Sequence, residues 1–360
     1  MIAMGLAALI VSAAIGRDGI TAKADKALQQ VARDPLDTAV LRTLGLRLDH
    51  EGRTAQADAV LSLVGRRTWL DGPTEAWLFR TRLRAGRFTE AFESADSLLR
   101  RDGQGELRPA LFPVLRAAAH YSEARPALVT RLEAAPWWRT DFLQDLALRG
   151  DVDGARLVMA TLSAGKAPPN PAEYAPLINR MVNAGTYRAA LQAWREIARP
   201  EGDAAALLRD GDFAGTSDQT DFTWSVADGV GGSSETGSAP DGSGGRALRV
   251  DYDGYASPRL PAQLLVAPPG RYRVTWREQG DVRRLAWRVR CVGSGRILAR
   301  ADEGAVSLSQ PSRWNDMAMT FEPATAGCDA QWLELAAIAG ERRNPVTGWY
   351  ERLRVAPAGQ

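Results

Sequence analysis

The stretch Gly86-Arg-Phe-Thr-Glu-Ala-Phe-Glu-Ser-Ala-Asp-Ser-Leu98 joins a glycine, an aromatic residue two positions later, and small or apolar residues at helical spacing. A glycine followed by alanine and apolar residues at helical spacing also begins at Gly52, 34 positions earlier, and at Gly150 and Gly185, 35 positions apart, with an aromatic residue again at Tyr187. Glycine can take the positive φ that ends a helix, and a small alanine then lets the next helix lie close against the first. The stretch therefore predicts a repeated pair of helices.

Five such pairs are expected, because the segments 107–120 and 123–134 form a further pair that lacks the turn glycine. The 34-residue period resembles that of tetratricopeptide repeats over about residues 24–200, although the tryptophan of their first helix is absent or displaced to Trp77. The resemblance implies a helical solenoid with a partner protein on its concave face. The alternative is that the helices serve only as a rigid spacer.

One segment, Ala135-Pro-Trp-Trp-Arg-Thr-Asp-Phe-Leu143, interrupts the period with two adjacent tryptophans. Neighbouring residues of a helix cannot both face one apolar stripe. We expect one of Trp137 and Trp138 to pack against the array and the other to be exposed.

The residues after about position 208 change from helical spacing to alternation with a period of two. Apolar residues alternate with polar ones at positions 248–252, 272–276, 285–291 and 333–335, and 351–355 reads as a final strand. Short alternating segments with turn-rich joints predict an antiparallel β-sandwich of the jelly-roll type. The glycine-rich residues 229–245 read as a flexible hairpin tip.

Two motifs in this half resemble the opening of carbohydrate-binding jelly-roll modules: Asp210-Gly-Asp-Phe213 and Phe222-Thr-Trp224. Later landmarks fit as well, at Arg246–Val250, Pro268–Tyr272 and Gly348–Val355. The whole chain is similar to membrane-anchored repeat proteins that carry such a module and occur with proteobacterial exopolysaccharide genes. The stretches Pro136–Arg139 and Cys328–Leu335 carry that wider resemblance.

A structural calcium is common in these modules, held by a glutamate after the opening phenylalanine and an aspartate in the last strand. This sequence has Ala214 and Glu351 at those positions. Calcium needs six to eight oxygen ligands, so the loss of one carboxylate argues against the ion. Asp212 and Glu351 are the residues that would remain to bind it.

A glycan-binding surface is expected where an exposed aromatic side chain stands beside polar groups. Side chains alternate between the two faces of a strand, and this parity places Trp276 and Trp287 in the core, on the face of Val274, Val289 and Cys291. The same alternation places Trp332 outward beside Glu334. The polar residues predicted around Trp332 are Arg288, Arg290 and Asp251. The alternative for Trp332 is packing against a loop or the helical array.

Charge and motifs argue against other functions. The 45 basic and 43 acidic residues nearly cancel, to +2, so no nucleic-acid partner is expected. Both histidines, His50 and His120, fall on repeat helices, and no phosphate-binding glycine loop is present, so we predict neither an enzyme nor a cofactor. Asp251 and Asp253 lie on one strand and read as solvated charges.

The two cysteines, Cys291 and Cys328, favour a disulfide within the sandwich, with two buried free thiols as the alternative. A disulfide indicates an oxidising compartment. The first 16 residues are apolar but shorter than the ~20 that span a bilayer, and Arg17, Lys23 and Lys26 follow them, which disfavours export. We still expect a membrane anchor with a periplasmic body in a Gram-negative envelope.

The sequence thus predicts an α-then-β multidomain chain. Its parts are a hydrophobic anchor or truncated signal segment (1–19), a tetratricopeptide-like helical domain (20–203) and a β-sandwich (204–360). The expected function is a non-catalytic envelope scaffold in exopolysaccharide synthesis or export, in which the repeats bind a protein and the sandwich binds glycan. The alternatives are an adaptor without sugar binding and a glycan-processing enzyme.

Overall fold

The computed structural model describes residues 37–201, 206–225, 229–242, 244–301, 313–324 and 326–359. The predicted anchor over residues 1–19 lies outside these ranges. The chain divides into two compact units, Met1–Tyr174 and Ala175–Gln360. The division falls inside the helical region, between Tyr174 and Ala175.

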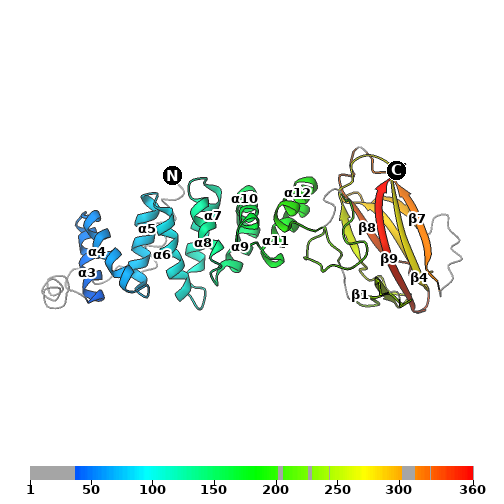
Figure 1. The fold of residues 1–360 in the computed structure, drawn as a ribbon, viewed down its shortest axis with the longest axis horizontal. Helices are drawn as coiled ribbons and strands as arrows, with labels where there is room; N and C mark the ends of the chain where they lie inside the picture. The colour runs from blue at the N-terminus through cyan, green and yellow to red at the C-terminus, as the bar shows by residue number, and fades with distance from the viewer. Residues whose placement is uncertain are drawn as a thin grey trace. The chain divides into compact units, whose positions relative to one another are not determined.

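Ten helices are seen in the described part of the chain, and they form five successive pairs (Figure 1). They are α3 (Thr38–His50), α4 (Thr54–Arg67), α5 (Gly72–Arg84), α6 (Phe88–Arg101), α7 (Arg108–His120), α8 (Arg125–Glu133), α9 (Arg139–Arg149), α10 (Val152–Ala164), α11 (Pro171–Asn183) and α12 (Tyr187–Ala198). The pairs match the predicted repeats, including the pair α7–α8 that lacks a turn glycine. The prediction of a repeated helix pair is confirmed.

The turn glycines do not all act alike. Gly52, Gly86 and Gly185 take φ values of 77°, 72° and 77°, as expected for a residue that ends a helix. Gly150 instead has φ −75°, and a Cβ there would lie 2.5 Å from the carbonyl oxygen of Leu146. At Gly150 the missing side chain therefore permits a close approach rather than a left-handed conformation.

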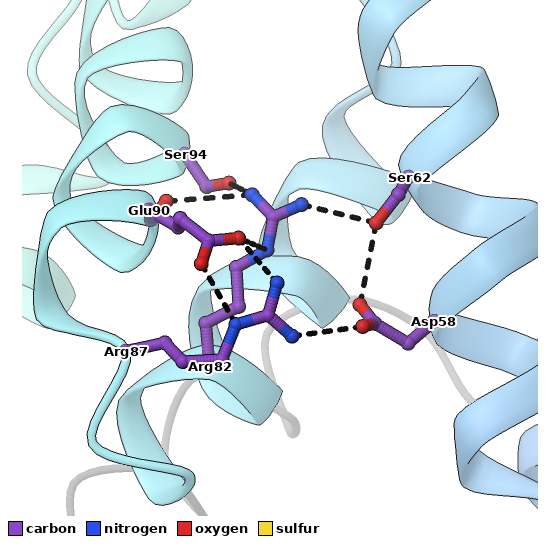
Figure 2. Close-up of polar contacts among 6 residues, drawn as sticks. All are labelled: Asp58, Ser62, Arg82, Arg87, Glu90 and Ser94. Atoms are coloured by element: carbon purple, nitrogen blue, oxygen red, sulfur yellow. Dashed lines mark hydrogen bonds and ion pairs between the residues drawn. The ribbon is translucent and has the colours of Figure 1, made fainter.

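A polar network joins three consecutive helices beside the apolar core of the array (Figure 2). Arg82 of α5 donates to Ser62 of α4 (3.1 Å) and to Ser94 of α6 (3.3 Å). Arg87, at the start of α6, donates to Asp58 of α4 (2.9 Å) and to Glu90 of its own helix. The hydrogen bonds from Arg87 lower the pKa of Glu90. Because Arg87 and Glu90 are exposed, we expect each of their ion pairs to contribute at most about 1 kcal/mol.

The described strands form two antiparallel sheets packed face to face. Their bounds are β1 (Gly232–Ser238), β2 (Arg246–Tyr252), β3 (Ala262–Leu265), β4 (Tyr272–Gly280), β5 (Leu285–Cys291), β6 (Ile297–Arg300), β7 (Asn315–Phe321), β8 (Gln331–Ala337) and β9 (Val346–Pro357). One sheet has the order β1-β2-β9-β4-β7 and the other the order β3-β8-β5-β6. The predicted sandwich is confirmed, but residues 232–238 form strand β1 rather than a flexible tip.

Aromatic side chains fill the space between the sheets. Trp276 and Trp287 are 2% and 1% exposed, as their parity predicted. Trp287 contacts Trp224 at 5.7 Å and Tyr350 at 5.5 Å between ring centroids. Cys291 and Cys328 form a disulfide that ties the end of β5 to the loop before β8, so the predicted disulfide is confirmed.

Candidate functional site

The outer face of the four-stranded sheet brings together three of the four residues predicted to bind glycan. In the register of β5 with β8, Arg290 lies opposite Trp332 and Arg288 lies opposite Glu334. Directly opposite residues of an antiparallel pair point to the same face. The face therefore presents one indole, two guanidinium groups and one carboxylate side by side.

The charged groups of this face are held in fixed positions by one another. Arg288 Nε and Arg290 Nε both donate to Oε1 of Glu334, at 2.7 Å and 2.8 Å, and Arg290 Nη2 donates to Oε2 at 3.2 Å. The side chains of both arginines remain about 30% exposed. Each guanidinium has five N–H donors, so donors remain for a ligand.

The carboxylate at the centre of the cluster is ionised more easily than usual. Burial would raise the pKa of Glu334, but the hydrogen bond from Arg290 and the charges of both arginines outweigh it, and the pKa is lowered. The hydrogen bond to Glu334 in turn raises the pKa of Arg290. The cluster therefore stays charged at neutral pH and offers both donors and acceptors to hydroxyl groups.

The ring of Trp332 differs from the other partly exposed tryptophans of the sandwich. The guanidinium of Arg249 lies over the ring of Trp349 (5.7 Å), and that of Arg277 lies over the ring of Trp314 (5.4 Å). Trp332 is partly exposed and has no ring contact or side-chain hydrogen bond with any described residue. Its ring is therefore the one of the three that no guanidinium covers.

Asp251, the fourth predicted residue, is not part of this face. It lies on β2 in the five-stranded sheet, where it accepts a 2.6 Å hydrogen bond from Thr347 and pairs with Arg249 at 3.1 Å. The parity of a strand places a side chain inward or outward but does not assign the strand to one of two sheets. The grouping of Asp251 with Trp332 is therefore corrected.

Glu334 was not among the predicted site residues, although the sequence contained a signal for it. It stands two positions after Trp332 in the same strand, so the same parity argument places it on the same face. Its pairing with Arg288 and Arg290, which stand two positions apart on β5, depends on the alignment of β5 with β8.

The two carboxylates considered for calcium are each bound to arginine. Asp212 accepts from Arg354 at 2.6 Å, and Glu351 accepts from Arg277 at 2.7 Å. Within the residues that the structure describes, no group of three or more histidine, cysteine or acidic side chains is arranged to hold a metal ion.

The motifs that resemble the opening of carbohydrate-binding modules serve the core. Phe213 and Trp224 are 0% and 3% exposed, with ring centroids 5.2 Å apart. Trp224 Nε1 donates to the carbonyl oxygen of Asp210. These aromatic residues fill the end of the sandwich and are not available to a ligand.

A second candidate surface is a groove of about 520 Å³ on the helical array, between α7 and α9. Phe112, Pro109 and Pro113 supply apolar surface from α7, and Leu148 of α9 is 58% exposed. Ion pairs join the two helices, Arg108 with Asp141 at 2.7 Å and Arg116 with Asp145. The groove thus combines exposed apolar surface with charges that are already paired.

The two adjacent tryptophans divide as predicted. Trp138 is 1% exposed, whereas Trp137 is 50% exposed and lies under the guanidinium of Arg108 at the groove. The helices of the array also include both histidines, in α3 and α7. No described helix is long and apolar enough to span a bilayer.

Comparison with known proteins finds similarity in structure only. No family model and no curated protein sequence matches the chain. The sandwich is similar to the xylan-binding CBM22-1 domain of Paenibacillus barcinonensis Xyn10C, with 11% identity and a TM-score of 0.29, over 38% of this chain and 86% of that one. A CBM61 module solved with β-1,4-galactotriose has 16% identity and a TM-score of 0.29, over 42% of this chain and 98% of that one. A putative sugar-binding protein from Bacteroides thetaiotaomicron has 11% identity and a TM-score of 0.30, over 42% of this chain and 99% of that one. These TM-scores and identities are too low for an inference about function.

Proposed function

We propose that the sandwich binds a polysaccharide on the outer face of β3-β8-β5-β6, with Trp332 as the stacking platform. The observation that carries the proposal is the partly exposed ring of Trp332, over which no described guanidinium lies, beside the fixed cluster of Arg288, Arg290 and Glu334. A sugar ring has an apolar face that packs on an indole and hydroxyl groups at its rim that bind planar charged groups. In this face both kinds of group are adjacent and already ordered.

The wider proposal is a non-catalytic scaffold of the cell envelope, acting in exopolysaccharide synthesis or export. Two features support it. The disulfide fits an oxidising compartment, and the α7–α9 groove offers exposed apolar surface for a partner protein. The membrane anchor over residues 1–19 and the tetratricopeptide identity of the repeats belong to this proposal and rest on the sequence.

Glycan binding is tested by titrating the full-length protein with the exopolysaccharide of its native host and with a panel of purified glycans. Trp332→Ala removes the platform, and Trp349→Ala is the matched control, because Trp349 is also a partly exposed tryptophan but lies on the opposite sheet under Arg249. Loss of a packed aromatic side chain costs about 2 kcal/mol, or roughly 30-fold in Kd.

We expect Trp332→Ala and Arg290→Ala to weaken binding and Trp349→Ala to leave it unchanged. Equal losses of glycan affinity in Trp332→Ala and Trp349→Ala would show that the site is not on the proposed face. Absence of binding to every glycan would leave the adaptor without sugar binding as the function, and release of glycan fragments on long incubation would favour an enzyme.

The protein-docking part is tested with a photo-reactive amino acid at position 148, in the native host. We expect a discrete cross-linked partner from position 148 and none from position 70, because Leu70 is similarly exposed (55%) but lies outside the groove. The same adducts from both positions would contradict docking in the α7–α9 groove.

A further inference from the structure

A second groove, of about 550 Å³, lies within the C-terminal unit between α12 and the connection from β3 to β4. One side of it is the α12 face with Arg188, Leu191 and Arg195, and the other is formed by Val266 and Pro268. The opposite face of α12, with Ala190, Ala193 and Trp194, is buried. The helix therefore turns a mixed basic and apolar face toward the groove.

The two arginines of this groove have no polar partner among the described residues. Neither Arg188 nor Arg195 makes a hydrogen bond or ion pair with any residue in the described ranges, and Nε of Arg195 is buried without an acceptor. They stand seven residues apart, about 10 Å along the helix axis, on the same face. Buried arginine donors normally find an acceptor, so this pair of positive charges is available to an anionic ligand.

The acidic residue of the groove does not neutralise these charges directly. Glu196 accepts a hydrogen bond of 3.0 Å from Gln192 on the same helix. With two arginines and one glutamate, the lining carries a net positive charge. Charge complementarity therefore favours an anion with an apolar face, which would contact Leu191, Val266 and Pro268.

Contacts of Trp194 hold α12 in place beside the sandwich. Trp194 Nε1 donates to Asp218 at 2.7 Å, and its ring lies 5.5 Å from that of Phe222. The guanidinium of Arg209 lies over the same ring, and the backbone N–H of Arg209 donates to Gln263 of β3. The groove is therefore built from ordered elements on both sides.

The groove continues the face proposed for glycan binding. Leu264 of β3 lies opposite Trp332, while Leu265 and Ala267 point into the core. The alternation therefore directs Leu264 and Val266 to the same face as Trp332. Leu264 itself is only 2% exposed, so a chain that stacks on Trp332 would reach the arginines of α12 over the partly exposed Val266.

We infer that the ligand is an acidic polysaccharide, whose carboxylate groups bind Arg188 and Arg195 while its neighbouring sugars occupy the Trp332 face. The inference rests on the proposed glycan binding and adds the chemical class of the glycan. An acidic polypeptide shares the charge but lacks the ring faces that pack on Trp332, so the polysaccharide is the better fit.

The test uses the full-length protein and three uronic-acid polysaccharides: alginate, polygalacturonate and hyaluronate. Each is compared with its carboxyl-reduced form and with polyglutamate. The variant Arg188→Gln/Arg195→Gln removes the groove charges. Its control, Arg259→Gln/Arg342→Gln, removes the same charge from exposed loop residues of the sandwich outside the groove.

We expect at least one uronic-acid chain to bind the wild-type protein and the groove variant to bind it about ten-fold more weakly, whereas the control variant changes Kd less than two-fold. Carboxyl reduction should weaken binding to the wild type but not further to the groove variant. Added salt should weaken binding of the acidic chain to the wild-type protein more than to the groove variant.

Several results would overturn the inference. Equal binding of the acidic chain by the groove variant and the wild type would refute it while leaving glycan binding intact, as would binding of neutral glycans only. Tighter binding of polyglutamate than of any polysaccharide would assign the groove to a polypeptide. Absence of binding to every glycan would refute both the inference and the proposed function.

Discussion

The indole Nε1 of Trp138 donates a 2.9 Å hydrogen bond to Oδ1 of Asp96, a carboxylate that is 4% exposed. The other oxygen of Asp96 accepts from Arg100 (3.1 Å) and Arg131 (3.2 Å). One buried carboxylate on α6 thus joins α8 and the start of α9. The interruption of the repeat period at the two tryptophans is a structural joint of the array.

Replacement of Asp96 by alanine should destabilise the helical array by about 3 kcal/mol, because it leaves the N–H of Trp138 unpaired and Arg131 without its buried counter-charge. Chemical denaturation followed by circular dichroism measures the change. Trp137→Ala, at an exposed ring, should cost less than about 0.5 kcal/mol. A loss from Trp137→Ala as large as that from Asp96→Ala would contradict the role of the joint.

Arg139 and Glu173 form a buried ion pair at 3.0 Å, with side chains 7% and 2% exposed. Glu173→Ala should destabilise the array by about 3–5 kcal/mol, since it leaves an uncompensated buried charge. The double variant Arg139→Met/Glu173→Leu should recover most of that loss. Additive losses in the double variant would show that the hydrogen bonds of Arg139 to the carbonyl oxygens of Ala167 and Pro168 dominate instead.

The disulfide should stabilise the sandwich by about 4 kcal/mol, because it closes a loop of 37 residues in the unfolded chain. Thermal unfolding with and without reductant measures this, and the Cys291→Ala/Cys328→Ala variant should be insensitive to the reductant. Thiol labelling of denatured, unreduced protein from its native host should find neither cysteine free. Two reactive thiols there would contradict the proposed oxidising compartment.

The titration of Glu278 should make the stability of the sandwich depend on pH. Burial raises its pKa, and the hydrogen bond from Trp276 Nε1 (2.8 Å) offsets this only in part. Because the folded-state pKa lies above the unfolded value of 4.5, the folded state binds the proton more tightly, and stability falls as pH rises through the window between the two values. Glu278→Gln should remove this fall and stabilise the sandwich at neutral pH. An unchanged pH profile in urea titrations of the variant would refute the assignment.

Gly211 has no room for a side chain, since a Cβ would lie 1.9 Å from the carbonyl oxygen of Leu353 in β9. Gly211→Ala should lower the melting temperature of the sandwich by separating the opening segment from the last strand. The matched control is Gly237→Ala in β1, where a Cβ would meet no atom within 4 Å. Equal melting temperatures for the two variants would show that the backbone at Gly211 shifts without cost.

Local pattern accounts for most of the fold prediction. A helix pair repeats its turn and its apolar stripe, so Gly52 and Gly86 mark its period without knowledge of any contact. Alternation similarly placed Trp276, Trp287 and Cys291 in the core. Strand β1 was missed because Gly232–Ser238 has no aromatic residue and only one β-branched residue, Thr236, and its place depends on pairing with β2.

The candidate site was predictable only in part. Trp332, Arg288 and Arg290 were predicted to point outward together, and they share one face, because alternation along a strand is enough to separate its two sides. Asp251 was misplaced because parity does not assign a strand to a sheet. Arg188 and Arg195 were not singled out, because their lack of partners among the described residues depends on where α12 packs beside β3.

The sequence by itself therefore determined the elements and their faces: repeated helices first, alternating strands afterwards, a cysteine pair in the sandwich and Trp332 pointing outward. These follow from the chain's own periodicity, which acts between residues a few positions apart. Only the tertiary structure decided that Glu334 binds both arginines, that Asp251 lies on the other sheet, and that α12 forms a basic groove beside β3. Those relations join residues far apart in the chain; in the groove, Arg188 and Pro268 stand 80 positions apart. Strand order and helix docking, which no local pattern encodes, bring them together.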